Sequence, residues 1–180
     1  MATTRREWIA GVSIGIPSFL LAASEVPAAD PSPGILRSCE SIHQQTFFDA
    51  TPSRLYAALT DAREFQKAVL LSAAVKSGLV SASEPAMIDA KPGGAFSIFG
   101  GHIAGRFIEL VPDQRIVQAW RAGDWGAGIY SIARFQLSGT TGGTILSFDH
   151  TGFPTGAAEH LATGWIDNYW MPLSRMLSEN

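Results

Sequence analysis

An apolar stripe near the end of the chain sets the strongest limit on the fold. Over residues 157–177, large apolar side chains recur three and four positions apart, which is the spacing of one face of a helix about twenty residues long. A helix with so wide an apolar face must pack that face against another layer of structure. The stripe consists of Leu161, Trp165, Ile166, Tyr169, Trp170, Leu173, Met176 and Leu177.

Short strands separated by glycine turns supply the second layer. Apolar and polar residues alternate in short runs, and the pairs Gly93-Gly94 and Gly100-Gly101 stand between two of them. Short strands joined by tight turns predict an antiparallel meander. We expect strands over residues 41–48, 87–88, 95–99, 102–110, 115–121, 129–137 and 144–151.

Two short helices are expected between the first strand and the meander. Thr51 is a suitable N-cap residue, and Pro52 suits the first helical position. Asp61 followed by Glu64 has the spacing of a capping box and opens the second helix. Residues 72–84 are small and polar, so we expect a loop or a frayed helix there. The resulting order of elements predicts an α+β fold.

Pro172 lies inside the long C-terminal helix that the stripe predicts. Proline lacks an amide hydrogen and its ring crowds the preceding turn, so the helix either ends near Met171 or bends and continues. Leu173, Met176 and Leu177 prolong the apolar face. We therefore expect a kinked helix that continues to about Leu177.

The N-terminal residues have the three parts of a secretory signal. Arg5 and Arg6 precede an uncharged, moderately apolar stretch, and small residues around Ala28 form a cleavage site. The paired arginines resemble a twin-arginine signal. We expect a signal over residues 1–28, a linker over 29–40 and one domain over 41–180. The domain would then be periplasmic or secreted, without a stable membrane span after cleavage. The alternatives are an uncleaved anchor and, if the signal does not function, a cytoplasmic protein.

Export is expected to depend on the two arginines. Replacing Arg5 and Arg6 together by lysine keeps the positive charge but removes the twin-arginine pattern, so export by that route should stop. The measurement is the compartment in which a tagged protein accumulates. Unchanged export of the double-lysine variant would contradict the assignment.

Composition excludes several classes of function. The 180 residues include 13 Lys and Arg against 16 Asp and Glu, without a block of like charge, so a nucleic-acid partner is not expected. One cysteine, Cys39, cannot form an internal disulfide or a cysteine-based metal cluster. The four histidines are scattered, so we expect no metal and no cofactor.

A set of short motifs carries a family resemblance over residues 42–177. In this order and spacing, the chain resembles the helix-grip SRPBCC (START-like) superfamily and is most similar to the C-terminal domain of activators of heat-shock protein 90 ATPase. The resemblance implies a curved antiparallel sheet wrapped around the long C-terminal helix, with a cavity between them. The motifs are residues 93–101, Gly105, residues 109–112, residues 116–121, Asp124-Trp125, Tyr130-Ser131, Gly143-Thr144 and Gly164-Trp165.

Strand alternation indicates which side chains face such a cavity. Ile116, Gln118 and Trp120 share one face of their strand. Asp149 and His150 are adjacent and therefore point to opposite faces, so we assign no catalytic residue. The alternative for Trp120 and Trp165 is that they simply fill the core. The candidate cavity residues are Phe96, Gln118, Trp120, Tyr130, Trp165 and Tyr169.

Three functions fit this scaffold. The first is binding of a small hydrophobic molecule in the cavity. The second is a protein-interaction module, similar to a co-chaperone, which predicts an exposed apolar patch. The third is a cyclase or hydrolase-like enzyme, which predicts a buried acid, histidine or arginine that faces the cavity.

Overall fold

The strands pair into one antiparallel sheet in the order β1-β7-β6-β5-β4-β3-β2. The structure is a computed structural model that describes residues 39–179. The predicted signal and most of the predicted linker lie outside the described residues. The strands are β1 (Cys39–Phe48), β2 (Met87–Ile88), β3 (Ala95–Ile98), β4 (Ile103–Val111), β5 (Arg115–Ala122), β6 (Ser131–Thr140) and β7 (Gly143–Pro154).

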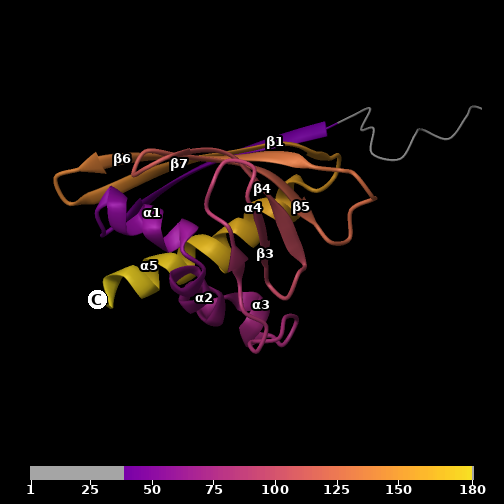
Figure 1. The fold of residues 1–180 in the computed structure, drawn as a ribbon, viewed down its shortest axis with the longest axis horizontal. Helices are drawn as coiled ribbons and strands as arrows, with labels where there is room; N and C mark the ends of the chain where they lie inside the picture. The colour runs from indigo at the N-terminus through magenta and orange to yellow at the C-terminus, as the bar shows by residue number, and fades with distance from the viewer. Residues whose placement is uncertain (1–38, 180) are drawn as a thin grey trace, which may run out of the picture. The chain divides into compact units, whose positions relative to one another are not determined.

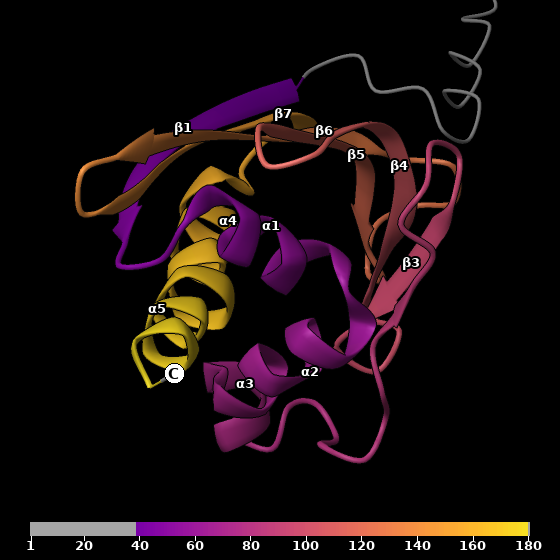
Figure 2. The same cartoon turned by 60° about the vertical axis from the view of Figure 1, so that its left-hand side comes forward.

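The helices lie on the concave side of this sheet. The sheet arches over α4, α5 and α1, while α2 and α3 lie at its open side (Figure 2). The C-terminal helical segment runs across the strands (Figure 1). This arrangement confirms the α+β helix-grip fold. The helices are α1 (Pro52–Thr60), α2 (Ala62–Leu71), α3 (Ala73–Lys76), α4 (Ala158–Trp165), the π-helical turn η1 (Ile166–Trp170) and α5 (Met171–Ser178).

Local capping explains why the first two helices begin where they do. The Thr51 side chain accepts a hydrogen bond from the amide of Arg54, and Pro52 follows it as the first helical residue. The Asp61 carboxylate accepts from the amides of Arg63 and Glu64. The Glu64 side chain pairs with Arg54 and Lys67. Both predicted N-caps are therefore confirmed.

The bounds of three strands, β1, β6 and β7, differ most from the prediction. β1 begins at Cys39, inside the predicted linker. β6 and β7 pair as far as Thr140 and Gly143, so the predicted strands, which end at residue 137 and begin at residue 144, both extend to a tight two-residue loop. Two-residue loops match the twist of paired strands, and this match allows the ladder to continue through residues that read as a turn.

The C-terminal helix continues through Pro172. α5 runs to Ser178, and Met176 and Leu177 are buried, which confirms the predicted continuation. The irregularity is a π-turn just before the proline, where the Met171 amide bonds the Ile166 carbonyl. A π-turn admits one extra residue. As a result, the sequence neighbours Tyr169 and Trp170 are both buried.

Aromatic side chains fill much of the space between sheet and helix. Phe135 and Phe148 from the sheet pack edgewise against Trp170 of the helix. Burial of such large apolar surfaces is the main stabilising contribution in a domain of this size. Among the described residues, no helix is long and apolar enough to cross a membrane.

Candidate functional site

A cavity of about 170 Å³ remains between the sheet and the C-terminal helix. Its walls combine aromatic side chains such as Trp120, Trp165 and Tyr169 with small residues such as Ala122 and Gly164. Because these small residues do not fill the space between the aromatic rings, a cavity remains there. A concave site with mostly apolar walls is typical of small-molecule binding.

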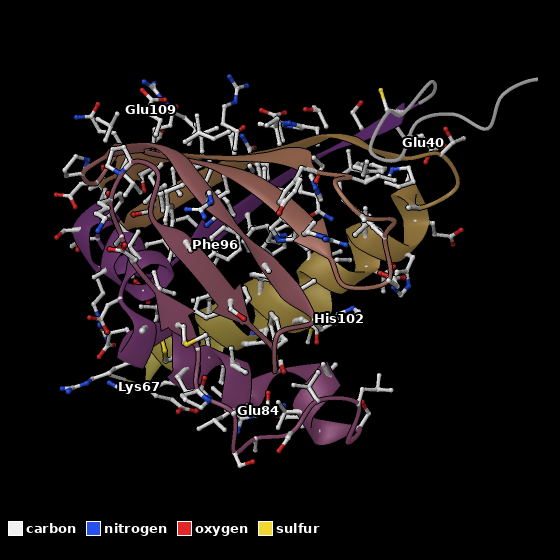
Figure 3. All side chains as sticks on the ribbon, turned by 45° about the vertical axis from the view of Figure 1, so that its right-hand side comes forward. Glu40, Lys67, Glu84, Phe96, His102 and Glu109 are labelled. Carbon is white, nitrogen blue, oxygen red and sulfur yellow. The ribbon has the colours of Figure 1, made fainter. Side chains whose placement is uncertain are left out.

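Exposed polar residues stand at the mouth of this cavity. They are His102 at the start of β4, Asp124 after β5 and His160 on α4. Figure 3 shows His102 at the turn between β3 and β4. The pairing of Ile103 with Ala122 brings the ends of β4 and β5 together, and the Gly123 amide bonds the His102 carbonyl at 2.6 Å.

The six candidate residues fall into three places. Trp120, Trp165 and Tyr169 line the cavity. Phe96 and Gln118 line a much smaller space of about 10 Å³, which Tyr169 also lines. Tyr130 lies outside both spaces, is 48% exposed and packs near the Arg121 guanidinium, 5.8 Å from the ring centre. Tyr130 lies outside because β6 begins only at Ser131, so strand alternation does not orient it.

Several residues of the cavity wall were not predicted. Leu161, Gly164 and Asn168 share the helix face of Trp165, so helical spacing could have indicated them. Ala122 continues the alternation of Gln118 and Trp120 on β5. The mouth residues carry no such signal, because their proximity depends on the register between strands.

A buried histidine links the sheet to the helix. The Trp165 indole N–H can only donate, and it donates to His150 Nδ1 at 3.0 Å. His150 Nε2 therefore carries the proton and donates to Ser131 Oγ at 2.6 Å, and Ser131 donates to the Trp120 carbonyl. Burial lowers the pKa of His150 to about 3, so the ring is neutral. Both ring nitrogens are thus engaged in positioning the two tryptophans.

Asp149 lies on the opposite face of β7, as predicted. Its carboxylate pairs with Arg134 at 2.6 Å and with His43 at 2.7 Å on the outer side of the sheet. These two partners, Arg134 first, lower the pKa of Asp149. Asp149 and His150 therefore do not form an acid–base pair.

Two polar atoms in the cavity wall lack a hydrogen-bond partner. The Trp120 Nε1–H and the Tyr169 hydroxyl are both enclosed, and neither has a hydrogen-bond partner beyond the contact between the two. Burial raises the pKa of Tyr169, and the neighbouring Trp120 indole partly opposes that rise. Buried polar groups are nearly always paired, so these two are unusual.

The described residues offer no metal site. Within residues 39–179, no three His, Cys, Asp or Glu side chains lie close enough together to hold a metal ion. The titratable residues that line the cavity are the exposed His102, Asp124 and His160 and the buried Tyr169.

Comparison with known proteins supports one family. The model of the "Activator of Hsp90 ATPase homolog 1-like protein" family matches residues 49–178. Activator of 90 kDa heat shock protein ATPase homolog 2 of Mus musculus is 25% identical over 154 residues, which are 86% of this chain and 43% of that protein. Homolog 1 of Homo sapiens is 31% identical over 86 residues, which are 48% of this chain and 25% of that protein. The chain thus spans less than half the length of these relatives.

A solved structure is similar over most of the described residues. The crystal structure of an HSP90 activator from Plasmodium falciparum superposes with a TM-score of 0.66 and 27% identity. The match covers 77% of this chain and 96% of that chain. Nearly all of that structure therefore corresponds to the sheet-and-helix domain described above.

Proposed function

We propose that the helix-grip domain of this chain, which belongs to the Activator of Hsp90 ATPase homolog 1-like family, binds a small apolar molecule between β5 and the C-terminal helix. The cavity of about 170 Å³ with its aromatic walls carries this proposal. An engineered protein cavity of about 150 Å³ accepts benzene. The expected ligand is therefore about the size of one substituted ring.

Filling the cavity from Gly164 should abolish binding without unfolding the domain. Gly164 lies on α4 in the cavity wall, and a Cβ added there meets no heavy atom within 4 Å. The Gly164→Leu side chain would occupy the ligand space, and it would raise helix propensity by about 1 kcal/mol. We expect binding of the apolar probe α-methylstyrene to weaken at least about tenfold, while the melting temperature rises.

Gly164→Ala is the matched control, because it improves the helix but adds only a methyl group. The Gly164→Ala variant should have a higher melting temperature than wild type and should keep most of the affinity for the probe. Ligand-observed NMR with the full chain measures both variants, and native mass spectrometry of the protein from its own host tests for a co-purifying molecule. Equal probe binding by wild type and Gly164→Leu would overturn the proposal.

A protein partner is the second candidate, and one surface favours it. Leu71, Met171 and Pro172 line a groove of about 260 Å³ between α2 and α5, where Met171 is 63% exposed. Relatives of this chain are named as activators of 90 kDa heat shock protein ATPase. The test is ATP hydrolysis by a purified 90 kDa heat shock protein with and without this chain. Stimulation that Met171→Asp abolishes would favour this candidate.

Fewer observations support the two remaining hypotheses, which are an enzymatic function and export to the periplasm. A cyclase or hydrolase-like mechanism needs a buried acid, histidine or arginine in the cavity wall, and the His150 ring nitrogens are occupied by Ser131 and Trp165. Export to the periplasm remains a proposal supported by the pattern of residues 1–28.

A further inference from the structure

Tyr169 separates the larger cavity from the smaller space beyond it. It is the residue common to the two linings. Phe96 and Gln118 lie on the far side, and Figure 3 shows Phe96 among the strands of the sheet. The Tyr169 ring packs against Trp165 at 4.1 Å and Phe99 at 5.3 Å, but no hydrogen bond holds its hydroxyl. Tyr169 is therefore the side chain at which the two spaces adjoin.

Two buried polar groups meet at this boundary. The Trp120 Nε1–H and the Tyr169 hydroxyl are enclosed, and neither has a hydrogen-bond partner apart from the contact between the two. Gln118, two residues before Trp120 on the same face of β5, is 9% exposed. An unpaired buried polar group costs free energy that a bound partner would recover.

The chemistry of these groups restricts what a ligand can present to them. The Trp120 indole can only donate, and the Tyr169 hydroxyl can donate as well. One oxygen with two lone pairs can accept from both. Neither lining contains Lys or Arg, so a carboxylate at this depth would be an unpaired buried charge. The complementary group is an uncharged carbonyl oxygen.

We propose that the bound molecule is a compact neutral carbonyl compound whose oxygen accepts hydrogen bonds from Trp120 Nε1–H and the Tyr169 hydroxyl. Both atoms are enclosed, so the Tyr169 side chain must turn before a ligand oxygen can reach them. This inference rests on the proposed ligand-binding function. It adds the polar class of the ligand and the residues that recognise it.

Three probes of nearly equal shape test the inference. Acetophenone carries the carbonyl, α-methylstyrene replaces its oxygen by a methylene, and benzoate carries a charge. With the full chain, acetophenone should bind roughly 5- to 30-fold more tightly than α-methylstyrene, the gain expected from one or two hydrogen bonds. Benzoate should bind more weakly than acetophenone.

The Tyr169→Phe variant removes one donor and keeps the ring. The preference for acetophenone over α-methylstyrene should fall to about threefold or less. Its melting temperature should stay within about 2 °C of wild type or rise, because the lost hydroxyl has no partner. Trp120→Phe should reduce the preference in the same way. The control is Tyr130→Phe, which lies outside both spaces and should keep the full preference.

Each contrary result has a separate meaning. Equal binding of acetophenone and α-methylstyrene would overturn this inference and leave the proposed function standing. Tightest binding of benzoate would also overturn it, because the mouth histidines His102 and His160 would then hold an anion. A lower melting temperature of Tyr169→Phe would show a hydroxyl already paired and would overturn it too. Failure of all three probes to bind would overturn the proposed function itself.

Discussion

Replacing Trp165 by alanine is expected to lower the free energy of unfolding by about 3–5 kcal/mol, the range for emptying a large buried aromatic site. The side chain is 2% exposed. Its ring lies 4.4 Å from Phe148 on the sheet and stacks on Trp170 at 5.4 Å. Alanine would remove these contacts and leave His150 Nδ1 without the indole donor, so packing and hydrogen bonding are lost together.

Urea denaturation of the full chain measures this loss. Trp165→Phe isolates the hydrogen bond, because it keeps much of the ring but removes the indole N–H. Trp125→Ala is the matched control at the cavity mouth, where the indole is only partly buried and contacts Trp120 at 5.4 Å. We expect about 1 kcal/mol for that control. A loss below about 1 kcal/mol for Trp165→Ala would mean that Trp165 does not anchor the helix to the sheet.

The fold was predictable because its signals are local. Thr51 and Asp61 cap helices by bonding amides two or three residues away, and such spacing is visible in a sequence. The apolar stripe around Trp165 marks a helix face in the same way. By contrast, the π-turn before Pro172 inserts one residue into a regular pattern. Sequence spacing does not distinguish this from a simple kink.

The site was predictable only in part, because it depends on contacts between distant strands. Alternation on β5 places Gln118 and Trp120 on the concave face, as expected. The approach of His102 to Asp124 follows from the register of β4 with β5, which no local pattern fixes. The hydrogen bonds of His150 join β7 to β6 and α4. From the sequence, its position next to Asp149 indicated only that the two side chains point to opposite faces of the strand.

Acid is expected to destabilise the domain through His150. The folded pKa is about 3, below the value of about 6.5 in the unfolded chain, because burial penalises the charged ring. Between these values the unfolded chain binds a proton that the folded protein excludes. The free energy of unfolding therefore falls as the pH falls from 6.5 towards 3, by about 1.4 kcal/mol per pH unit and by about 5 kcal/mol in all. Above pH 6.5 this contribution is fully present and constant.

In the upper half of this pH range, between about pH 5 and pH 6.5, the change in stability reports on His150. Lys67 and Arg54 lower the pKa of Glu64, and Arg134 and His43 lower that of Asp149, so the stability that these carboxylates contribute is lost only at lower pH.

His150→Gln tests the assignment, because an amide can accept from the Trp165 indole and donate to Ser131 but cannot titrate. Its stability should change little between pH 6.5 and pH 5, whereas wild type should lose about 2 kcal/mol. His160→Gln, at the exposed cavity mouth, is the control and should keep the wild-type slope. Urea melts at several pH values measure all three proteins. Parallel losses in wild type and His150→Gln would show that the acid sensitivity arises elsewhere, and the neutral link between sheet and helix would then carry no pH dependence.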